Sequence, residues 1–145
     1  TGAVSGLVAI TPAAGTVDIV GAFFIGLITP LICFYMVAVI KPRFKYDDTL
    51  DAFGVHGIGG IVGSILTGVF ATQFISGEGG VKGALYGDWH QLWIQIFATL
   101  VSIVFSAIIT FILYKVVDSW IGIRVSRRVE EEGLDIYEHG ESAYN

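Results

Sequence analysis

The stretch that decides the fold is Tyr46–Ala71, which reads YDDTLDAFGVHGIGGIVGSILTGVFA. Acidic residues crowd its start, and after Asp51 no charged residue occurs before Glu78. A helix needs roughly 20 predominantly apolar residues to cross the hydrocarbon core of a bilayer, and this run is long enough. His56 lies inside the run, among glycines. We therefore expect a transmembrane helix that carries an ionisable ring at membrane depth.

The composition of the whole chain is also typical of a membrane protein. Its 145 residues are 54% hydrophobic and 14% charged, whereas a soluble domain has about 25% charged residues. The formal net charge is −5, but six of the thirteen acidic residues lie between Glu130 and Glu141. The negative charge is therefore local to the C-terminal end and does not indicate a nucleic-acid partner.

The sequence predicts neither a cofactor nor a metal site. Cys33 is the only cysteine and lies in an apolar run, and no Cys/His cluster has zinc-ligand spacing. Asp47, Asp48 and Asp51 offer a second reading as metal ligands, but they stand before or in the first turn of the expected helix. Carboxylates there cap free N–H groups and oppose the helix dipole. We expect the three acids to have this structural capping role.

Three runs are long enough to span the bilayer as helices, at about 19–40, 49–74 and 89–123. Before them, TGAVSGLVAITPAAG lacks an initiator Met and the charged start of a signal peptide. We read it as the end of an earlier span, and the chain as a fragment or incompletely numbered part of a longer protein. Residues 1–128 then form a transmembrane region, and 129–145 an acidic tail.

The basic residues predict the orientation of these spans. Only Lys82 lies between the second and third runs. Lys41, Arg43 and Lys45 follow the first run, and the remaining basic residues lie near the end of the last run or after it: Lys115, Arg124, Arg127 and Arg128. Since positive charge stays on the cytoplasmic side, the tail is expected to be cytoplasmic. Pro30 should kink its helix. The helical pattern of the last span continues to Gly133, which we expect to end it.

His56 is predicted to lie on a face of small residues. At 3.6 residues per turn, Ala52, Gly60, Gly63 and Thr67 fall near it on the helix surface. The pair of Gly59 and Gly63 adds a spacing that allows helices to pack closely, but helix packing alone does not require a histidine. Ionisable groups at membrane depth usually face a cavity or a pathway. A neutral imidazole both donates and accepts a hydrogen bond, so the sequence indicates a polar path that can hold or pass a proton.

These residues resemble a known family. Tyr46–Ala71 is similar to the histidine signature of ammonium transporters of the Amt/Mep/Rh family, and GAVSGLVAITPAAG, HQLWIQ and EEEGLDIYEHGESAYN match the family in the same order. The resemblance implies an all-α membrane protein. The chain would hold the C-terminal spans of an eleven-helix, inverted-repeat ammonium transporter, from within the eighth span to a long tilted helix and a cytoplasmic tail.

The resemblance also implies a site and partners. His56 would be one member of a pore histidine pair whose other member lies outside this chain, with Thr11 and Ala52 also lining the pore. The family is a homotrimer in the cell membrane (plasma or bacterial inner membrane). A PII-type signal protein binds some members from the cytoplasm, which suggests a regulatory tail with these residues: Gly133, Leu134, Asp135, His139 and Gly140.

The predicted function is ammonium transport in nitrogen metabolism, with deprotonation of ammonium and passage of ammonia through a hydrophobic pore. The partners are then ammonium or ammonia and the lipid bilayer, and the protein is not expected to be an enzyme. The alternative is an ammonium sensor that acts in signalling. A membrane enzyme or a metal carrier would need paired carboxylates or a cluster of Cys/His ligands within the spans, and the sequence shows neither there.

Overall fold

The computed structural model describes residues 1–141, and all of its regular elements in this range are helical. The chain divides into two compact units, Thr1–Ser102 and Ile103–Asn145. Within residues 1–141, three helices are long and apolar enough to cross a membrane: Ile19–Phe44, Phe53–Phe70 and Trp89–Ile121. The predicted all-α membrane fold is therefore confirmed.

The first unit contains three helical runs that pack together and the start of a fourth. Helix α1 (Gly2–Ile10) continues into the 3₁₀ turn Thr11–Ala13. Helix α2 (Ile19–Tyr35), the π turn Met36–Ile40 and helix α3 (Lys41–Phe44) form the second run. The π turn Phe53–Gly57 and helix α4 (Ile58–Phe70) form the third. Helix α5 (Gln73–Ser76) and the 3₁₀ turn Ala84–Tyr86 precede the fourth, α6 (Trp89–Ile121).

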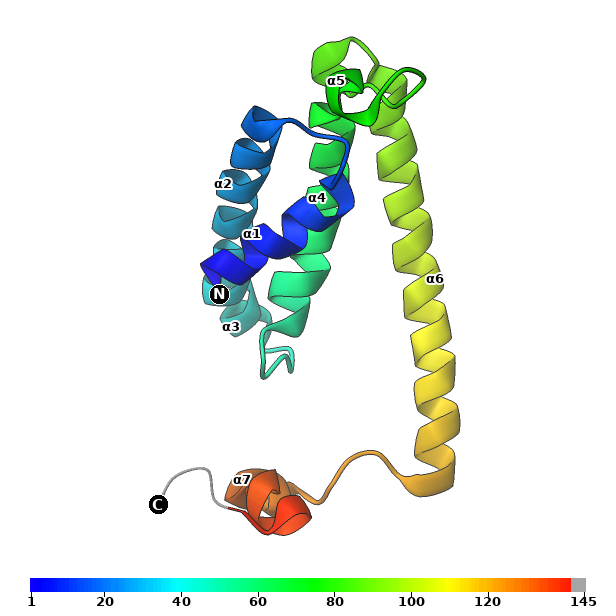
Figure 1. The fold of residues 1–145 in the computed structure, drawn as a ribbon. Coiled ribbons are helices and arrows are strands. Elements are labelled where there is room, and N and C mark those ends of the chain that lie inside the picture. The colour runs from blue at the N-terminus through cyan, green and yellow to red at the C-terminus, as the bar shows by residue number, and fades with distance from the viewer. Residues whose placement is uncertain (142–145) are drawn as a thin grey trace. The chain divides into compact units, whose positions relative to one another are not determined.

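Helix α1 lies across α2 and α4 and packs against both (Figure 1). The small core at this crossing contains Ala9, Ala13 and Ile25, each fully buried. The rings of Phe24 and Phe70 stack beside it, 6.0 Å apart. Because most other apolar side chains of these helices remain exposed, their surfaces suit lipid or further protein, as expected for membrane spans.

Two loops are joined at one end of the helices. The Thr72 N–H donates to the carbonyl of Thr16 at 2.7 Å, and the Tyr86 hydroxyl donates to Asp18 Oδ2 at 3.2 Å. The same Asp18 caps α2 by accepting from the Gly21 N–H at 2.8 Å. The loops before α2 and after α4 therefore lie on the same side, as helices that cross a bilayer in alternating directions require.

The second unit contains the rest of α6 and the start of the tail. Helix α6 ends at Ile121, where Gly122 has φ +67° and Asp118 Oδ1 accepts from the Ile123 N–H at 3.1 Å. The prediction of one helix as far as Gly133 is therefore wrong, because a glycine in the left-handed region and an Asp118 cap end the helix earlier. A separate helix, α7 (Arg127–Glu132), follows, and Gly133 ends that helix instead.

Candidate functional site

His56 lies in the π turn Phe53–Gly57, where the Ile58 N–H bonds to the carbonyl of Phe53 five residues earlier. Turns of this kind are rare and frequently occur at functional sites. The side chain of His56 is exposed, and within residues 1–141 its imidazole makes no hydrogen bond. Both ring nitrogens are therefore available to a small polar molecule or to protein outside this chain.

The predicted face of small residues is divided by α1. Gly63 packs against the backbone of Ala9, and Thr67 is buried, with its hydroxyl donating to the carbonyl of Gly63 at 2.8 Å. Gly60 faces open space, since a Cβ there would meet nothing within 4 Å. The uncovered part of the face is thus centred on His56, with the exposed Ala52 one turn before it.

Thr11 lies at the end of α1, in the 3₁₀ turn, and its side chain is exposed. Its hydroxyl donates to the carbonyl of Leu7 at 2.9 Å, which leaves the oxygen able to accept a hydrogen bond. No hydrogen bond joins Thr11 to His56 in the described part of the chain. The structure therefore leaves the two side chains accessible without linking them.

The three acids before the π turn have different contacts. Asp48 accepts from the N–H groups of Phe53 at 3.1 Å and Gly54 at 3.1 Å, which is the geometry of a helix cap. Asp51 instead pairs with Lys41, with 2.6 Å between Nζ and Oδ1. Asp47 Oδ1 accepts from the Thr49 hydroxyl at 3.2 Å. Among residues 1–141, no group of three or more His, Cys, Asp or Glu is arranged to hold a metal ion.

The environment of Asp48 favours its charged form. Burial by itself would raise the pKa of this carboxyl, but the N–H groups of Gly54, Phe53 and Ala52 and the charge of Lys41 outweigh it. The pKa of Asp48 therefore lies below its usual range. The carboxylate stays ionised at neutral pH and satisfies N–H groups that the helix start leaves free.

Lys41 is a residue whose role sequence reasoning missed, because it was considered only as an indicator of orientation. Its ammonium group contacts two of the acids, across seven and ten residues of sequence. Neither spacing places the partners next to each other on one helix or strand, because a loop separates Lys41 from the two acids. The spacings therefore do not predict the contacts. The acid-rich stretch so soon after a basic helix end is the one feature of the sequence that could have indicated such a pairing.

The tail combines charge pairs with glycine turns. Three arginines pair with three glutamates: Arg124 with Glu130, Arg127 with Glu131 and Arg128 with Glu132, at 2.7, 2.9 and 2.7 Å. Of the predicted regulatory residues, Asp135 and His139 begin and end a π turn, and Gly133 and Gly140 flank it with φ +108° and +66°. Leu134 lies between, 47% exposed. The structure thus places these five residues in one short segment.

Tyr137 and Glu132 form one further contact in the tail, in which the hydroxyl donates to the carboxylate. This hydrogen bond lowers the pKa of Glu132, assisted by Arg128, and it raises the pKa of Tyr137, as does partial burial. The proton therefore stays on the phenol, and the carboxylate stays charged, through the neutral range.

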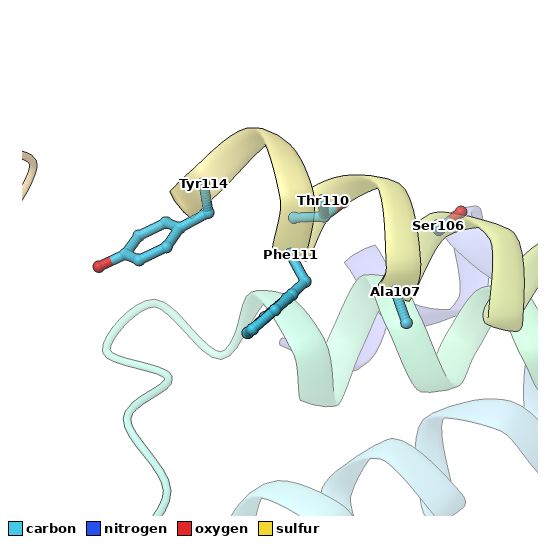
Figure 2. A pocket seen from close by; sticks show the side chains of 5 residues that line it. All are labelled: Ser106, Ala107, Thr110, Phe111 and Tyr114. Atoms are coloured by element: carbon cyan, nitrogen blue, oxygen red, sulfur yellow. The ribbon is translucent and has the colours of Figure 1, made fainter. Parts of the chain in front are cut away.

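A shallow apolar hollow lies on α6 in the second unit. Its lining residues are Ser106, Ala107, Thr110, Phe111 and Tyr114, and Figure 2 shows Ala107 and Phe111 pointing to the same side of the helix. None of the predicted site residues lines it. Three of its lining side chains carry a hydroxyl, Ser106, Thr110 and Tyr114, and it otherwise resembles the rest of the exposed apolar surface of α6.

The helices and the exposed imidazole together define a multi-pass membrane protein with an ionisable group on a span. The model of the Ammonium Transporter Family matches residues 1–144. The chain belongs to this family, and the resemblance inferred from the sequence is confirmed.

Individual relatives agree with this assignment. The chain is 50% identical to the ammonium transporter of Aquifex aeolicus over 145 residues, which is all of this chain and 33% of that protein. It is 46% identical to the ammonium transporter of Bacillus subtilis, over 99% of this chain and 35% of that protein. The crystal structure of Saccharomyces cerevisiae Mep2 has a TM-score of 0.77 at 32% identity, covering 86% of this chain and 29% of Mep2. The chain thus spans about a third of the length of these relatives, which are named as transporters and not as enzymes.

Proposed function

We propose that the protein containing this chain transports ammonium across the cell membrane, and that His56 lies on the path. Membership of the ammonium transporter family supports the substrate. The observation that carries the role of His56 is its position: an imidazole that makes no hydrogen bond to any of residues 1–141 and is exposed on a membrane-length helix. A side chain of this kind is costly in lipid, and it is therefore expected to face a pathway.

The chemistry of such a path explains how ammonium is separated from sodium and potassium. Moving any bare monovalent ion into a low-dielectric pore costs tens of kcal/mol in the Born estimate. Ammonium avoids this cost by releasing its proton and crossing as neutral ammonia, which alkali metal ions cannot do. A neutral imidazole at position 56 offers ammonia a donor and an acceptor in place of water, and a second histidine from outside this chain would complete the pair.

Thr11 and Ala52 are proposed to line the same path. Both side chains are exposed, and α1 carries the turn of Thr11 next to the helix that carries His56. The small methyl group of Ala52 keeps the space one turn before the imidazole free, while the hydroxyl of Thr11 supplies a polar contact near one end.

The assembly and regulation of the protein are proposed by the same family relationship. We expect a homotrimer with the tail in the cytoplasm. The tail segment from Gly133 to Gly140 would then be the part available to a PII-type signal protein. Its exposed acidic and polar groups suit a protein partner, and removing residues after Arg128 should abolish PII retention in a pull-down if the proposal is correct.

The role of His56 is tested in the complete protein, reconstituted into proteoliposomes. His56→Ala should strongly reduce the ammonium-driven current while the protein still elutes as the parent does. His90→Ala is the matched control, because His90 lies at the start of α6 and its hydrogen bond to Asp88 uses only its backbone N–H. An unchanged current and unchanged selectivity for His56→Ala would remove His56 from the pathway.

A further inference from the structure

Lys41 connects the end of one span to the start of another. It begins α3, directly after the π turn Met36–Ile40. Its ammonium group donates to the backbone carbonyl of Asp48 at 2.6 Å and to Asp51 Oδ1 at 2.6 Å. The side chains of Lys41 and Asp51 are only 26% and 29% exposed, so this pair is shielded from water more than an ordinary surface ion pair and is correspondingly stronger.

Both acids that contact Lys41 hold the first turn of the histidine helix. Asp48 accepts hydrogen bonds from the N–H groups of Phe53 and Gly54 through its carboxylate, and the Asp51 carbonyl accepts from the Val55 N–H at 2.8 Å. Asp51 has φ +56°, a left-handed conformation that costs energy for a residue with a side chain. The ion pair to Lys41 offsets that cost and keeps the loop in this shape.

The two π turns are also packed against each other. Val37, in the first π turn, lies so close to Gly54, in the second, that a Cβ on Gly54 would be 2.6 Å from Val37 Cγ2. The ring of Tyr46 contacts that of Phe53 edge to face, with 5.9 Å between the ring centroids. The turn that carries His56 is therefore fixed by an ion pair, a cap and close packing from the same neighbouring segment.

We propose that Lys41 is a positioning residue for His56: by holding Asp48 and Asp51 it maintains the π turn and so fixes the direction of the imidazole. A π turn holds one more residue than an α turn. If it relaxed to an α-helix, the segment that begins in the turn and runs back toward Asp51 would rotate relative to α4 by up to roughly 100°, the angle of one α-helical residue, and His56 lies inside the turn where this change occurs. The inference that this affects transport rests on the proposed function, whereas the effect on the position of His56 does not.

The position of His56 is tested by labelling, independently of transport. His56→Cys is made in the complete protein with all other cysteines replaced, and its rate of modification by a small water-soluble thiosulfonate is measured with Lys41 present and with Lys41→Met. We expect a several-fold change in rate for Lys41→Met, and a rate close to the parent's for Lys41→Arg, which keeps the charge. Lys115→Met, on α6, is the matched control and should leave the rate unchanged.

Transport is measured on the same backgrounds with the natural His56. Lys41→Met should reduce ammonium current per folded protein by about tenfold or more, since small displacements of reacting groups have effects of up to about 100-fold. It should also raise the ratio of potassium to ammonium conductance. If Lys41→Met fails to fold, Asp51→Asn tests the same pair, and the double variant should be no worse than either single one.

The outcomes separate the two proposals. If the parent protein carries no ammonium current, the proposed function is overturned. The labelling experiment would still report the position of residue 56 in that case. Parent protein with current, combined with an unchanged labelling rate and unchanged selectivity for Lys41→Met or Asp51→Asn, would overturn the positioning role. A loss of current with unchanged selectivity and unchanged labelling would also overturn it, because it would indicate a contribution to folding alone.

Discussion

The backbone of Ala9 on α1 lies directly against Gly63 on α4: a Cβ on Gly63 would be 2.8 Å from the Cα of Ala9. This contact sets where α1 crosses the helix that carries His56. It covers the C-terminal half of the small-residue face and leaves the half around Gly60 open. The crossing point of two helices thus determines how much of the candidate path remains accessible.

Gly63→Ala should destabilise the complete protein by about 1–3 kcal/mol, the usual cost of adding atoms to a well-packed contact. Gly60→Ala is the matched control, since it adds the same methyl group on the same helix where nothing lies within 4 Å. It should be neutral or slightly stabilising, because alanine favours a helix by about 1 kcal/mol over glycine. Thermal unfolding in detergent measures both. Equal effects of the two substitutions would show that the close contact with Ala9 is absent.

Asp48→Ala should lower the stability of the protein at neutral pH, because it removes the cap of the π turn. The pKa of Asp48 is lower in the folded protein than in the unfolded chain. The stability that its carboxylate contributes is therefore fully present above the ordinary aspartate pKa of about 3.9. It is lost as the pH falls through the lower pKa of the folded state. The difference in unfolding temperature between the parent and Asp48→Ala should therefore be constant near neutrality and should shrink in acid. Glu78→Ala, in an exposed loop, is the control. A difference that does not depend on pH would contradict the ionised cap.

Tyr86→Phe should loosen the junction of the two loops by removing the hydrogen bond to Asp18, at a cost of roughly 0.5 kcal/mol, the low end for an exposed hydrogen bond. The pKa of Tyr86 is raised by burial and by the nearby Asp18 carboxylate. The stability that this hydrogen bond contributes is therefore fully present below the ordinary tyrosine pKa. It is lost as the pH rises through the higher pKa of the folded state. Tyr35→Phe, on the exposed side of α2, controls for the loss of a hydroxyl. Faster amide exchange at Thr72 in Tyr86→Phe alone is the expected readout, and equal exchange in both variants would argue against the junction.

Gly122→Ala should destabilise the turn that terminates α6. Gly122 has φ +67°, and a residue with a side chain in that conformation costs about 1–2 kcal/mol. The strain is relieved if α6 continues as a helix past residue 122, which would displace α7. Limited proteolysis between Ile121 and Arg127 should therefore become slower in the variant. Gly140→Ala, which also replaces a glycine of positive φ but lies in the tail, should leave cleavage at this site unchanged. Cleavage at the same rate in the parent and Gly122→Ala would indicate that the glycine does not set the end of the helix.

The sequence predicted the main features that depend on length and spacing. Apolar runs indicated membrane helices because lipid tolerates few other structures, and the spacing of Gly59 and Gly63 indicated close packing because small residues let helix backbones approach each other. The structure has these helices, and both glycines are buried. The family followed from motifs around His56 and in the tail, and the comparisons confirm it.

The features that sequence reasoning missed depend on contacts between segments. A π turn of five residues is too short to show a repeat of apolar residues that differs from that of an α-helix. The sequence therefore could not predict the turns at Met36–Ile40 and Phe53–Gly57. The pair of Lys41 with Asp51 forms only when both helix ends are in place. The end of α6 was missed because one glycine does not interrupt an apolar pattern, and the Asp118 cap that accompanies it lies four residues earlier. The roles of Thr11, Ala52 and His56 remain predictions.

The charge pairs of α7 have a consequence for the way the chain enters the membrane. Arg124, Arg127 and Arg128 emerge from the ribosome before the glutamates that neutralise them, so the insertion machinery meets three unmatched positive charges behind the last span. Once Glu130, Glu131 and Glu132 have followed and α7 has formed, residues 124–132 carry no net charge by formal count. The positive charges that follow α6 are thus balanced within residues 124–132, so this segment exerts little net attraction on anionic headgroups.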